Sequence, residues 1–296
     1  MSVSILPVRS ALDMERFLDV PHEVHAGNPL WVPPLRSQDR DLLTPGRHPF
    51  WETARRELFL AVRGGRTVGR LAALVDEKYN AYTGEACGAF GFFECQNDAG
   101  AAHALLDAGR AWLVRQGMAF MRGPLNPSAN YTCGLLVDGF ELPPTIMMPW
   151  NPPYYAELLE SWCLRKEQDL FAYLIERERL ALPQWLRQEV ARLKAEGRFT
   201  CRTSSRKTLT DDIRIMLDIY RQSWARNWGF SPLSPGEAEC HVRELKTILD
   251  PDFFVLFFHR GEPAAGMVAL PDMNPLLRRL NGRLGLSAPW HWWRSR

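Results

Sequence analysis

The pattern of hydrophobic and polar residues is clearest between Phe90 and Gly123. A short aromatic run, Phe90-Gly91-Phe92-Phe93, is typical of a half-buried strand. Small and polar residues at 96–100 then predict a turn and a helix start, with Asn97 or Asp98 as the N-cap. Apolar residues at helical spacing follow, and residues 119–123 predict another strand. This order predicts two parallel strands joined by a right-handed crossover.

Further elements flank this unit on both sides. Before it, the pattern predicts a strand, a helix and a strand hairpin that turns at Arg63-Gly64-Gly65-Arg66, at residues 3–8, 11–26, 58–62 and 67–76. After it comes a long Pro-, Gly- and Asn-rich segment, residues 124–153, of a kind that is often functional. The pattern then predicts a helix at 154–163, a buried strand at 169–175 and a helix at 183–196.

From Arg198 onward the order of elements starts again. A strand, two helices and a strand hairpin are predicted at 199–203, 210–224, 235–249 and 253–270. Asp13 corresponds to Asp211 in this second copy, and Gly69 corresponds to Gly266. Nothing follows that matches the aromatic strand and its helix, so either this copy is completed from elsewhere or it is truncated, the reading we favour. Chance similarity between two α/β halves is the alternative.

Length and composition limit the class of protein. A chain of 296 residues predicts two domains, and 46% hydrophobic with 24% charged residues is typical of a globular protein. A net charge of +2 gives no support for a nucleic-acid partner. Six widely spaced cysteines predict reduced thiols in a cytoplasmic protein, and no stretch predicts a membrane span. The tryptophan-rich residues 290–293 predict either a contact surface or the stump of a helix.

The helix start near Asp98 is the first candidate site. Free backbone amides and the helix dipole make such a position favourable for an anion such as a phosphate. The carboxylate of Asp98 opposes this, because no Lys or Arg lies between Lys78 and Arg110 to compensate it. We therefore expect weak anion binding in this first copy.

The order of elements resembles the GNAT superfamily of acyl-CoA-dependent acyltransferases, in a tandem arrangement of uncharacterised bacterial type. The fold class expected from it is a mixed α/β sheet, with a complete GNAT-like domain at 1–180, a linker helix at 181–197 and a partial, C-terminally incomplete domain at 198–296. The family's pyrophosphate loop reads Gln/Arg-x-x-Gly-x-Gly/Ala. The best match here keeps the Gly and the final Ala of this motif but starts with Asn. The resemblance implies that acetyl-CoA or another acyl-CoA is the co-substrate, bound by Asn97, Asp98, Ala99, Gly100, Ala101 and Ala102.

The resemblance also implies residues for the chemistry. Glu94 ends the aromatic strand, where the family often keeps a carboxylate that deprotonates the amine through water. Tyr154 and Tyr155 lie one turn before the family's general-acid position and are candidates for that role. A surface carboxylate and packed tyrosines are the alternative interpretations. Candidate substrate contacts in the long segment are Asn126, Asn130, Tyr131 and Asn151, although turn formation explains asparagines equally well.

Two functions from different classes remain. The first is an N-acyltransferase that moves an acyl group from acyl-CoA to a small-molecule amine, weakened or inactive in this form. Its catalysis would come from positioning the reactants and stabilising the oxyanion. The second is a non-catalytic GNAT-like module that binds a small molecule or a protein. No metal is expected, because His22 and His25 lack a third ligand at a recognisable spacing. A transferase that uses aminoacyl-tRNA is disfavoured by the near-neutral charge.

Overall fold

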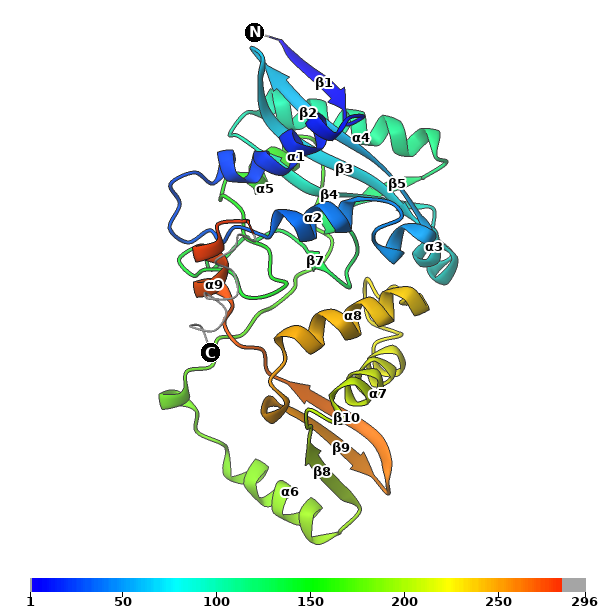
Figure 1. The fold of residues 1–296 in the computed structure, drawn as a ribbon, viewed down its shortest axis with the longest axis vertical. Coiled ribbons are helices and arrows are strands. Elements are labelled where there is room, and N and C mark those ends of the chain that lie inside the picture. The colour runs from blue at the N-terminus through cyan, green and yellow to red at the C-terminus, as the bar shows by residue number, and fades with distance from the viewer. Residues whose placement is uncertain (1, 284–296) are drawn as a thin grey trace. The chain divides into compact units, whose positions relative to one another are not determined.

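The computed structural model describes residues 2–283, which form two compact units (Figure 1). The first unit contains residues 2–165, 228–234 and 272–283, and the second contains residues 166–227 and 235–271. The tryptophan-rich residues 290–293 lie outside the described part of the chain. Among the described residues, no helix combines the length and the apolar character that crossing a bilayer requires. The six cysteines form no disulfide bonds within this described part.

The first unit is built on a mixed five-stranded sheet, as the sequence predicted. Its strands follow the chain in the order β1-β2-β3-β4-β5, with bounds Val3–Pro7, Ala54–Arg63, Arg66–Asp76, Cys87–Cys95 and Phe120–Arg122. Successive strands pair antiparallel except β4 and β5, which are parallel and are connected by helix α4 (Ala99–Arg115). Gly64 and Gly65 both have positive φ (57° and 80°), which matches the two-residue hairpin turn predicted between β2 and β3.

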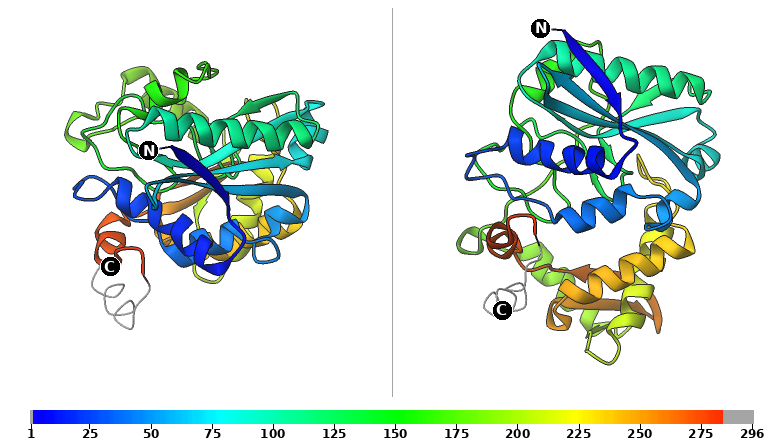
Figure 2. Two further views of the ribbon diagram at one scale, coloured as in Figure 1. Left: turned by 90° about the horizontal axis from the view of Figure 1, so that it is seen from above. Right: turned by 45° about the horizontal axis from the view of Figure 1, so that its top comes forward.

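Both faces of this sheet are covered by helices. Figure 2 shows α4 on one face, and α1 (Ala11–Val24) and α2 (Arg36–Leu43) on the other. Side chains alternate between two cores: Phe59, Ala61 and Leu71 pack with Leu105 and Leu106 of α4, whereas Leu58, Leu60 and Ala72 pack with Phe17 and Leu18 of α1. Strands covered on both sides read as nearly continuous apolar runs, which explains why β2 and β3 show little polar alternation.

The parallel strands β4 and β5 separate after three paired positions, Cys87 to Ala89 on β4. Phe92 has a positive φ of 48°, and the register of β4 against β3 shifts at this point, so β4 carries a bulge. The chain after β5 then lies against β4. A Cβ on Gly91 would come within 1.6 Å of the Leu125 carbonyl oxygen, so only glycine permits this approach.

Shorter elements complete the first unit. They are α3 (Glu77–Thr83), the hairpin of β6 (Leu125–Asn126) and β7 (Thr132–Cys133), α5 (Tyr155–Glu160), α9 (Asn274–Leu280) and the 3-10 turn Pro49–Glu52. The start of α1 is fixed by a capping box, in which Ser10 and Asp13 each accept a hydrogen bond from the other's backbone amide.

The second unit repeats the first part of this order. Its strands β8 (Phe199–Thr203), β9 (Phe254–His259) and β10 (Glu262–Val268) form an antiparallel sheet in the order β10-β9-β8. Helices α7 (Leu209–Ser223) and α8 (Pro235–Ile248) lie between β8 and β9 in the chain, and their apolar residues share one core with the sheet. The predicted repeat of strand, two helices and hairpin is therefore confirmed. The unit also contains α6 (Gln184–Ala195) and the 3-10 turns Arg177–Arg179 and Pro251–Phe253.

The strand predicted at 169–175 is wrong. This segment has no regular secondary structure, and its large apolar side chains are exposed, with Phe171 at 77% and Tyr173 at 85%. Apolar and aromatic residues favour a strand only where a neighbouring strand receives their backbone hydrogen bonds. Among the described residues, no strand pairs with this segment. The sequence pattern therefore indicated the strand-forming residues but not the absence of a partner.

Candidate functional site

The start of α4 is capped by its own side chain. Asp98 is the N-cap, and its carboxylate accepts a hydrogen bond from the Ala101 amide at 3.1 Å. Arg63, at the end of β2, donates to both carboxylate oxygens of Asp98, at 2.7 and 2.9 Å. The other predicted cofactor residues, Asn97, Ala99, Gly100 and Ala102, lie at the same helix start.

These contacts occupy the predicted anion site with a protein carboxylate. Partial burial opposes ionisation, but Arg63 and the amides of Ala101 and Gly100 hold the pKa of Asp98 below its ordinary value. The role of Arg63 was not predicted, since it lies 35 residues before Asp98 in the chain. The β2–β3 hairpin that carries Arg63 was predicted, and this position was the sequence signal from which its contact with the start of α4 could have been inferred. A phosphate at this site would have to take over the contacts of Asp98.

Glu94 lies at the centre of a buried hydrogen-bond network. Its Oε2 atom accepts a hydrogen bond from the Tyr155 hydroxyl at 2.6 Å and lies 3.0 Å from Nε2 of His25. His25 follows α1 as its C-cap, and Tyr155 begins α5. Burial tends to raise the pKa of Glu94, but the hydrogen bond and the electrostatic effect of His25, then the charge of Arg70 and the hydrogen bond from Tyr155, bring it below the ordinary value. Glu94 is therefore held as a carboxylate.

Both tyrosines that were predicted as general acids bind protein groups. Tyr155 donates to Glu94 and accepts from the Cys95 amide at 2.9 Å, whereas Tyr154 donates to the Cys95 carbonyl at 3.0 Å. Burial raises the pKa of Tyr154 to about 12, and burial together with Glu94 raises the pKa of Tyr155 well above its ordinary value. In this arrangement the two hydroxyls stabilise the end of β4.

Further charged groups surround Glu94. Arg70 is buried on β3, directly opposite Glu94 in the strand register, and donates to the Phe17 carbonyl at 3.0 Å. Burial lowers the pKa of Arg70, while the charges of Glu94 and Asp39 raise it. Removal from water raises the pKa of Asp39, on α2, to about 6. One arginine therefore compensates two carboxylates in an interior where unpaired charges are costly.

The predicted substrate residues make contacts within the protein. Asn126 accepts from the Phe92 amide at 2.5 Å, and Asn151 exchanges hydrogen bonds with the main chain of Leu136. Asn130 donates to the Ser231 carbonyl at 2.8 Å. The ring of Tyr131 packs edge-on against His48 and Phe50. These contacts hold the long segment after β5 and the bulge in β4 in place.

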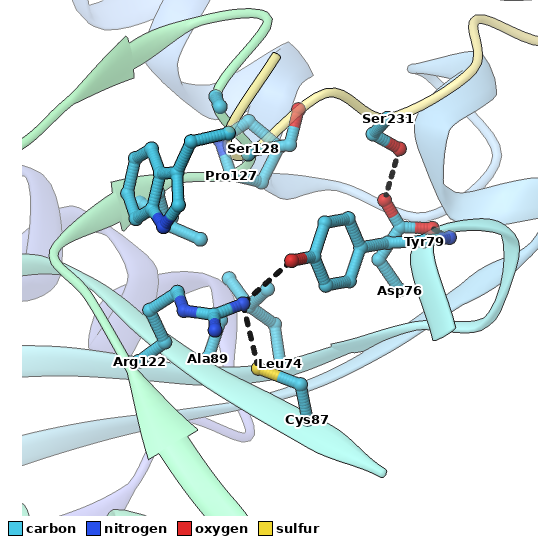
Figure 3. Close-up of a pocket in the computed structure, with 13 residues that line it drawn as sticks. Leu74, Asp76, Tyr79, Cys87, Ala89, Arg122, Pro127, Ser128 and Ser231 are labelled. Carbon is cyan, nitrogen blue, oxygen red and sulfur yellow. Dashed lines mark hydrogen bonds between the residues drawn. The ribbon is translucent and has the colours of Figure 1, made fainter. Parts of the chain in front are cut away.

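A small cavity lies beside this segment in the first unit (Figure 3). Arg122 donates to the Tyr79 hydroxyl at 2.5 Å, and Ser231 donates to Asp76 at 2.9 Å. The cavity volume is about 30 Å³, which leaves room for about two or three water molecules. It is too small for a substrate, so we assign it to the structure of the fold.

A larger cleft opens at the end of α1. It has a volume of about 440 Å³ and is lined by the end of α1, the loop after it and α9, through His22, His25, residues 26–29, Trp31, Pro33, Arg278 and Asn281. His25 thus joins this cleft to Glu94 of the buried network. The sequence pattern suggested no role for His25 beyond that of a metal ligand, since its contact with Glu94 spans 69 residues and no local pattern marks it.

Comparison with known proteins places the chain. No protein-family model matches it. Among solved structures, it resembles a tandem GNAT protein from the clavulanic acid biosynthesis pathway, with 12% identity and a TM-score of 0.43 over 90% of this chain and 75% of that one. It also resembles an aminoglycoside acetyltransferase from an uncultured soil metagenomic sample, with 12% identity and a TM-score of 0.37 over 59% and 97% of the two chains. TM-scores this low carry no weight in the assignment.

The sequence relatives are much closer. The chain is 33% identical over 283 residues to the bacterial ceramide synthase of Caulobacter vibrioides, covering 95% of this chain and 73% of that protein. It is 30% identical over 276 residues to protein YghO of Escherichia coli, covering 92% and 69% of the two chains. At this identity and coverage, the chain belongs to the family of the bacterial ceramide synthase and YghO.

Proposed function

We propose that this protein is an N-acyltransferase that joins an acyl group from a thioester to the amine of a long-chain amino alcohol. The observation that supports this most strongly is the 33% identity, over 95% of the chain, to a protein named bacterial ceramide synthase. A ceramide is the amide of a fatty acid and a long-chain amino alcohol. The resemblance to acyl-CoA-dependent N-acyltransferases, which rests on the order of elements, independently supports the same bond-forming reaction.

The geometry of the first unit is consistent with this chemistry. An amine must lose a proton to form an amide, and the unit holds a carboxylate, Glu94, in contact with a histidine that lines a cleft. The strands β4 and β5 separate beside α4, where the resemblance implies the acyl thioester. Placing the amine and the thioester together would supply much of the rate enhancement, because it converts a bimolecular reaction into an effectively unimolecular one.

We propose acyl-CoA as the donor. A pyrophosphate at the start of α4 would take the amide of Ala101 from Asp98, and Arg63 would then serve as its counter-ion. Arginine forms bidentate contacts with phosphate as well as with carboxylate, so it suits either partner. This arrangement predicts a donor that binds weakly, because one anion replaces another.

The alternative, a non-catalytic binding module, is favoured by one observation. Asp98 already occupies the anion site, with contacts to Arg63 and to the backbone. A module that had lost its acyl donor would keep the cleft and need no free anion site. It would bind the amine without converting it.

The deciding experiment uses the full chain with palmitoyl-CoA and sphinganine, and measures the amide by mass spectrometry. We expect N-palmitoylsphinganine to form in proportion to enzyme concentration, and heat-denatured protein to serve as the control for spontaneous acylation. Absence of the amide, together with a saturable thermal shift by sphinganine, would overturn the acyltransferase proposal in favour of the binding module. A second donor, acetyl-CoA, would show whether the acyl chain length matters.

A further inference from the structure

The cleft at the end of α1 contains two histidines with unusual surroundings. His22 and His25 are three residues apart and both line the cleft of about 440 Å³. The His25 ring stacks on Trp31, with centroids 4.9 Å apart, and meets Trp150 edge-on at 5.5 Å. Only 1% of the His25 side chain is exposed. Its ring is therefore held firmly by aromatic packing on one side and by Glu94 on the other.

The hydrogen bonds fix which ring nitrogen of His25 carries the proton. Oε2 of Glu94 accepts the hydroxyl proton of Tyr155 at 2.6 Å and lies 3.0 Å from His25 Nε2. A carboxylate has no proton to donate, so Nε2 of His25 must be the donor in this pair. In the neutral imidazole, Nδ1 then carries the lone pair.

This Nδ1 atom is buried and has no hydrogen-bond partner among the described residues. The same is true of Nε2 of His22. Buried polar atoms in native proteins almost always have a partner, so an unpaired nitrogen calls for a functional explanation. A lone pair on a fixed ring, oriented by a carboxylate, is the arrangement of a general base.

We propose that the cleft binds the acceptor amine and that Nδ1 of His25 removes its proton during acyl transfer. This inference rests on the proposed N-acyltransferase function and assigns its acceptor site. The amine nitrogen forms a bond to the thioester carbonyl carbon, and the carbon–sulfur bond breaks. The proton passes from nitrogen to His25 Nδ1 and then to the departing thiolate. Amine and thioester thus give amide and thiol without a further reactant.

Glu94 acts through His25 in this arrangement. Its Oε2 atom is already engaged by two donors, so it holds the imidazole in one tautomer and stabilises the imidazolium once the proton has transferred. Glu94 is thus a positioning residue, and Tyr155 in turn fixes Glu94. His22, whose pKa is lowered by burial and then by the charge of Arg36, is neutral and suits a hydroxyl group of the amino alcohol.

The test substitutes His25 so that the contact with Glu94 is kept. In His25→Gln, the side-chain amide can still donate to Glu94 but offers no basic nitrogen. We expect kcat for amide formation from palmitoyl-CoA and sphinganine to fall by about 10²–10⁴-fold, with the KM for sphinganine changed only a few-fold. The matched control is His259→Gln on β9 of the second unit, which should leave kcat unchanged. A His25→Gln enzyme with the kcat of the wild type would overturn the inference.

Chemical rescue with imidazole distinguishes a general base from a residue that only packs in the cleft. In His25→Ala, added imidazole should restore activity saturably, and more basic substituted imidazoles should restore it more. Rescue that is independent of basicity would overturn the role of His25 as a base. The same series on Glu94→Gln should show no rescue, because that variant retains its imidazole.

A measurement on the wild-type protein keeps the inference testable without activity. Histidine side-chain NMR should show the proton of His25 on Nε2, and sphinganine alone should shift the Nδ1 signal. A proton on Nδ1, or a signal unmoved by saturating sphinganine, would overturn this inference. If the wild type makes no amide but sphinganine shifts Nδ1, then the acyltransferase proposal fails while the amine site stands.

Discussion

Removal of the Tyr155 hydroxyl is the sharpest test of the network around Glu94. The hydroxyl donates to a carboxylate at 2.6 Å and accepts from the Cys95 amide at 2.9 Å, and only 2% of the residue is exposed. Tyr155→Phe keeps the ring and its contact with Phe93, whose centroid lies 5.1 Å away. The variant therefore removes two hydrogen bonds and little packing.

The magnitude follows from those two bonds. A hydrogen bond to a charged group contributes about 1.5–3 kcal/mol, and a buried amide left unpaired costs about 1–3 kcal/mol. Because the two contributions overlap at one oxygen atom, we expect Tyr155→Phe to lower the free energy of unfolding by about 2–4 kcal/mol. In a unit of this size, that corresponds to a decrease in Tm of roughly 5–15 °C.

Tyr154→Phe is the matched control. Its hydroxyl makes one neutral hydrogen bond, to the Cys95 carbonyl at 3.0 Å, so the expected loss is only about 1 kcal/mol. Denaturant unfolding of both variants, followed by tryptophan fluorescence, gives the two free energies of unfolding. Equal losses for Tyr154→Phe and Tyr155→Phe would refute the reasoning, because the charged acceptor would then contribute nothing.

The same comparison has a pH dependence of known sign. The pKa of Glu94 is lower in the folded protein than its ordinary value of 4.5, so its contribution to stability is present above that pH. It is lost as the pH falls through the folded-state pKa. Tyr155→Phe removes one of the bonds that lower this pKa. The difference in unfolding free energy between wild type and variant should therefore be largest at neutral pH and shrink in acid.

Three further predictions follow from other contacts. Gly91→Ala places a methyl group 1.6 Å from the Leu125 carbonyl oxygen, so we expect the free energy of unfolding to fall by more than about 3 kcal/mol, with little folded protein by circular dichroism. Asp98→Asn keeps an N-cap but removes the carboxylate that Arg63 binds, so calorimetry should show coenzyme A binding about tenfold tighter, and an unchanged Kd would exclude this anion site. Asp39→Asn removes a carboxyl whose pKa is raised to about 6, so its ionised form destabilises the folded state. Urea unfolding should therefore show an unfolding free energy about 1 kcal/mol higher in the variant above pH 6, and this difference should disappear as the pH falls toward 3.8.

Local patterns predicted most elements of the first unit, although they located neither α2 nor α3. The hairpin at Arg63 to Arg66, the parallel strands around α4 and the N-cap at Asp98 each depend on residues close together in the chain, and all are confirmed. Turn chemistry and helix caps act over a few residues, so the sequence contains their cause directly.

The errors and omissions arise where a partner lies far away in the chain. Residues 169–175 have strand-forming side chains but no pairing strand among the described residues. Arg63 reaches Asp98 across 35 residues, and His25 reaches Glu94 across 69. A pairwise contact of this kind changes the chemistry of both groups, but it leaves no periodic signal in the sequence. The predicted catalytic and substrate residues remain predictions.

The two sides of the proposed reaction differ in how far the first unit completes them. On the amine side, Glu94 fixes the tautomer of His25, and Nδ1 has no hydrogen-bond partner among the described residues, so proton transfer needs only that this buried atom be uncovered for the amine. On the donor side, Arg63 and the Ala101 amide already hold the Asp98 carboxylate, and exchange of one anion for another gains little free energy. Weak donor binding predicts a high KM for acyl-CoA. Competent proton transfer predicts that kcat still falls when His25 is replaced. Asp98→Asn should lower that KM and leave the effect of His25→Gln on kcat intact, because the two sites contribute to separate steps.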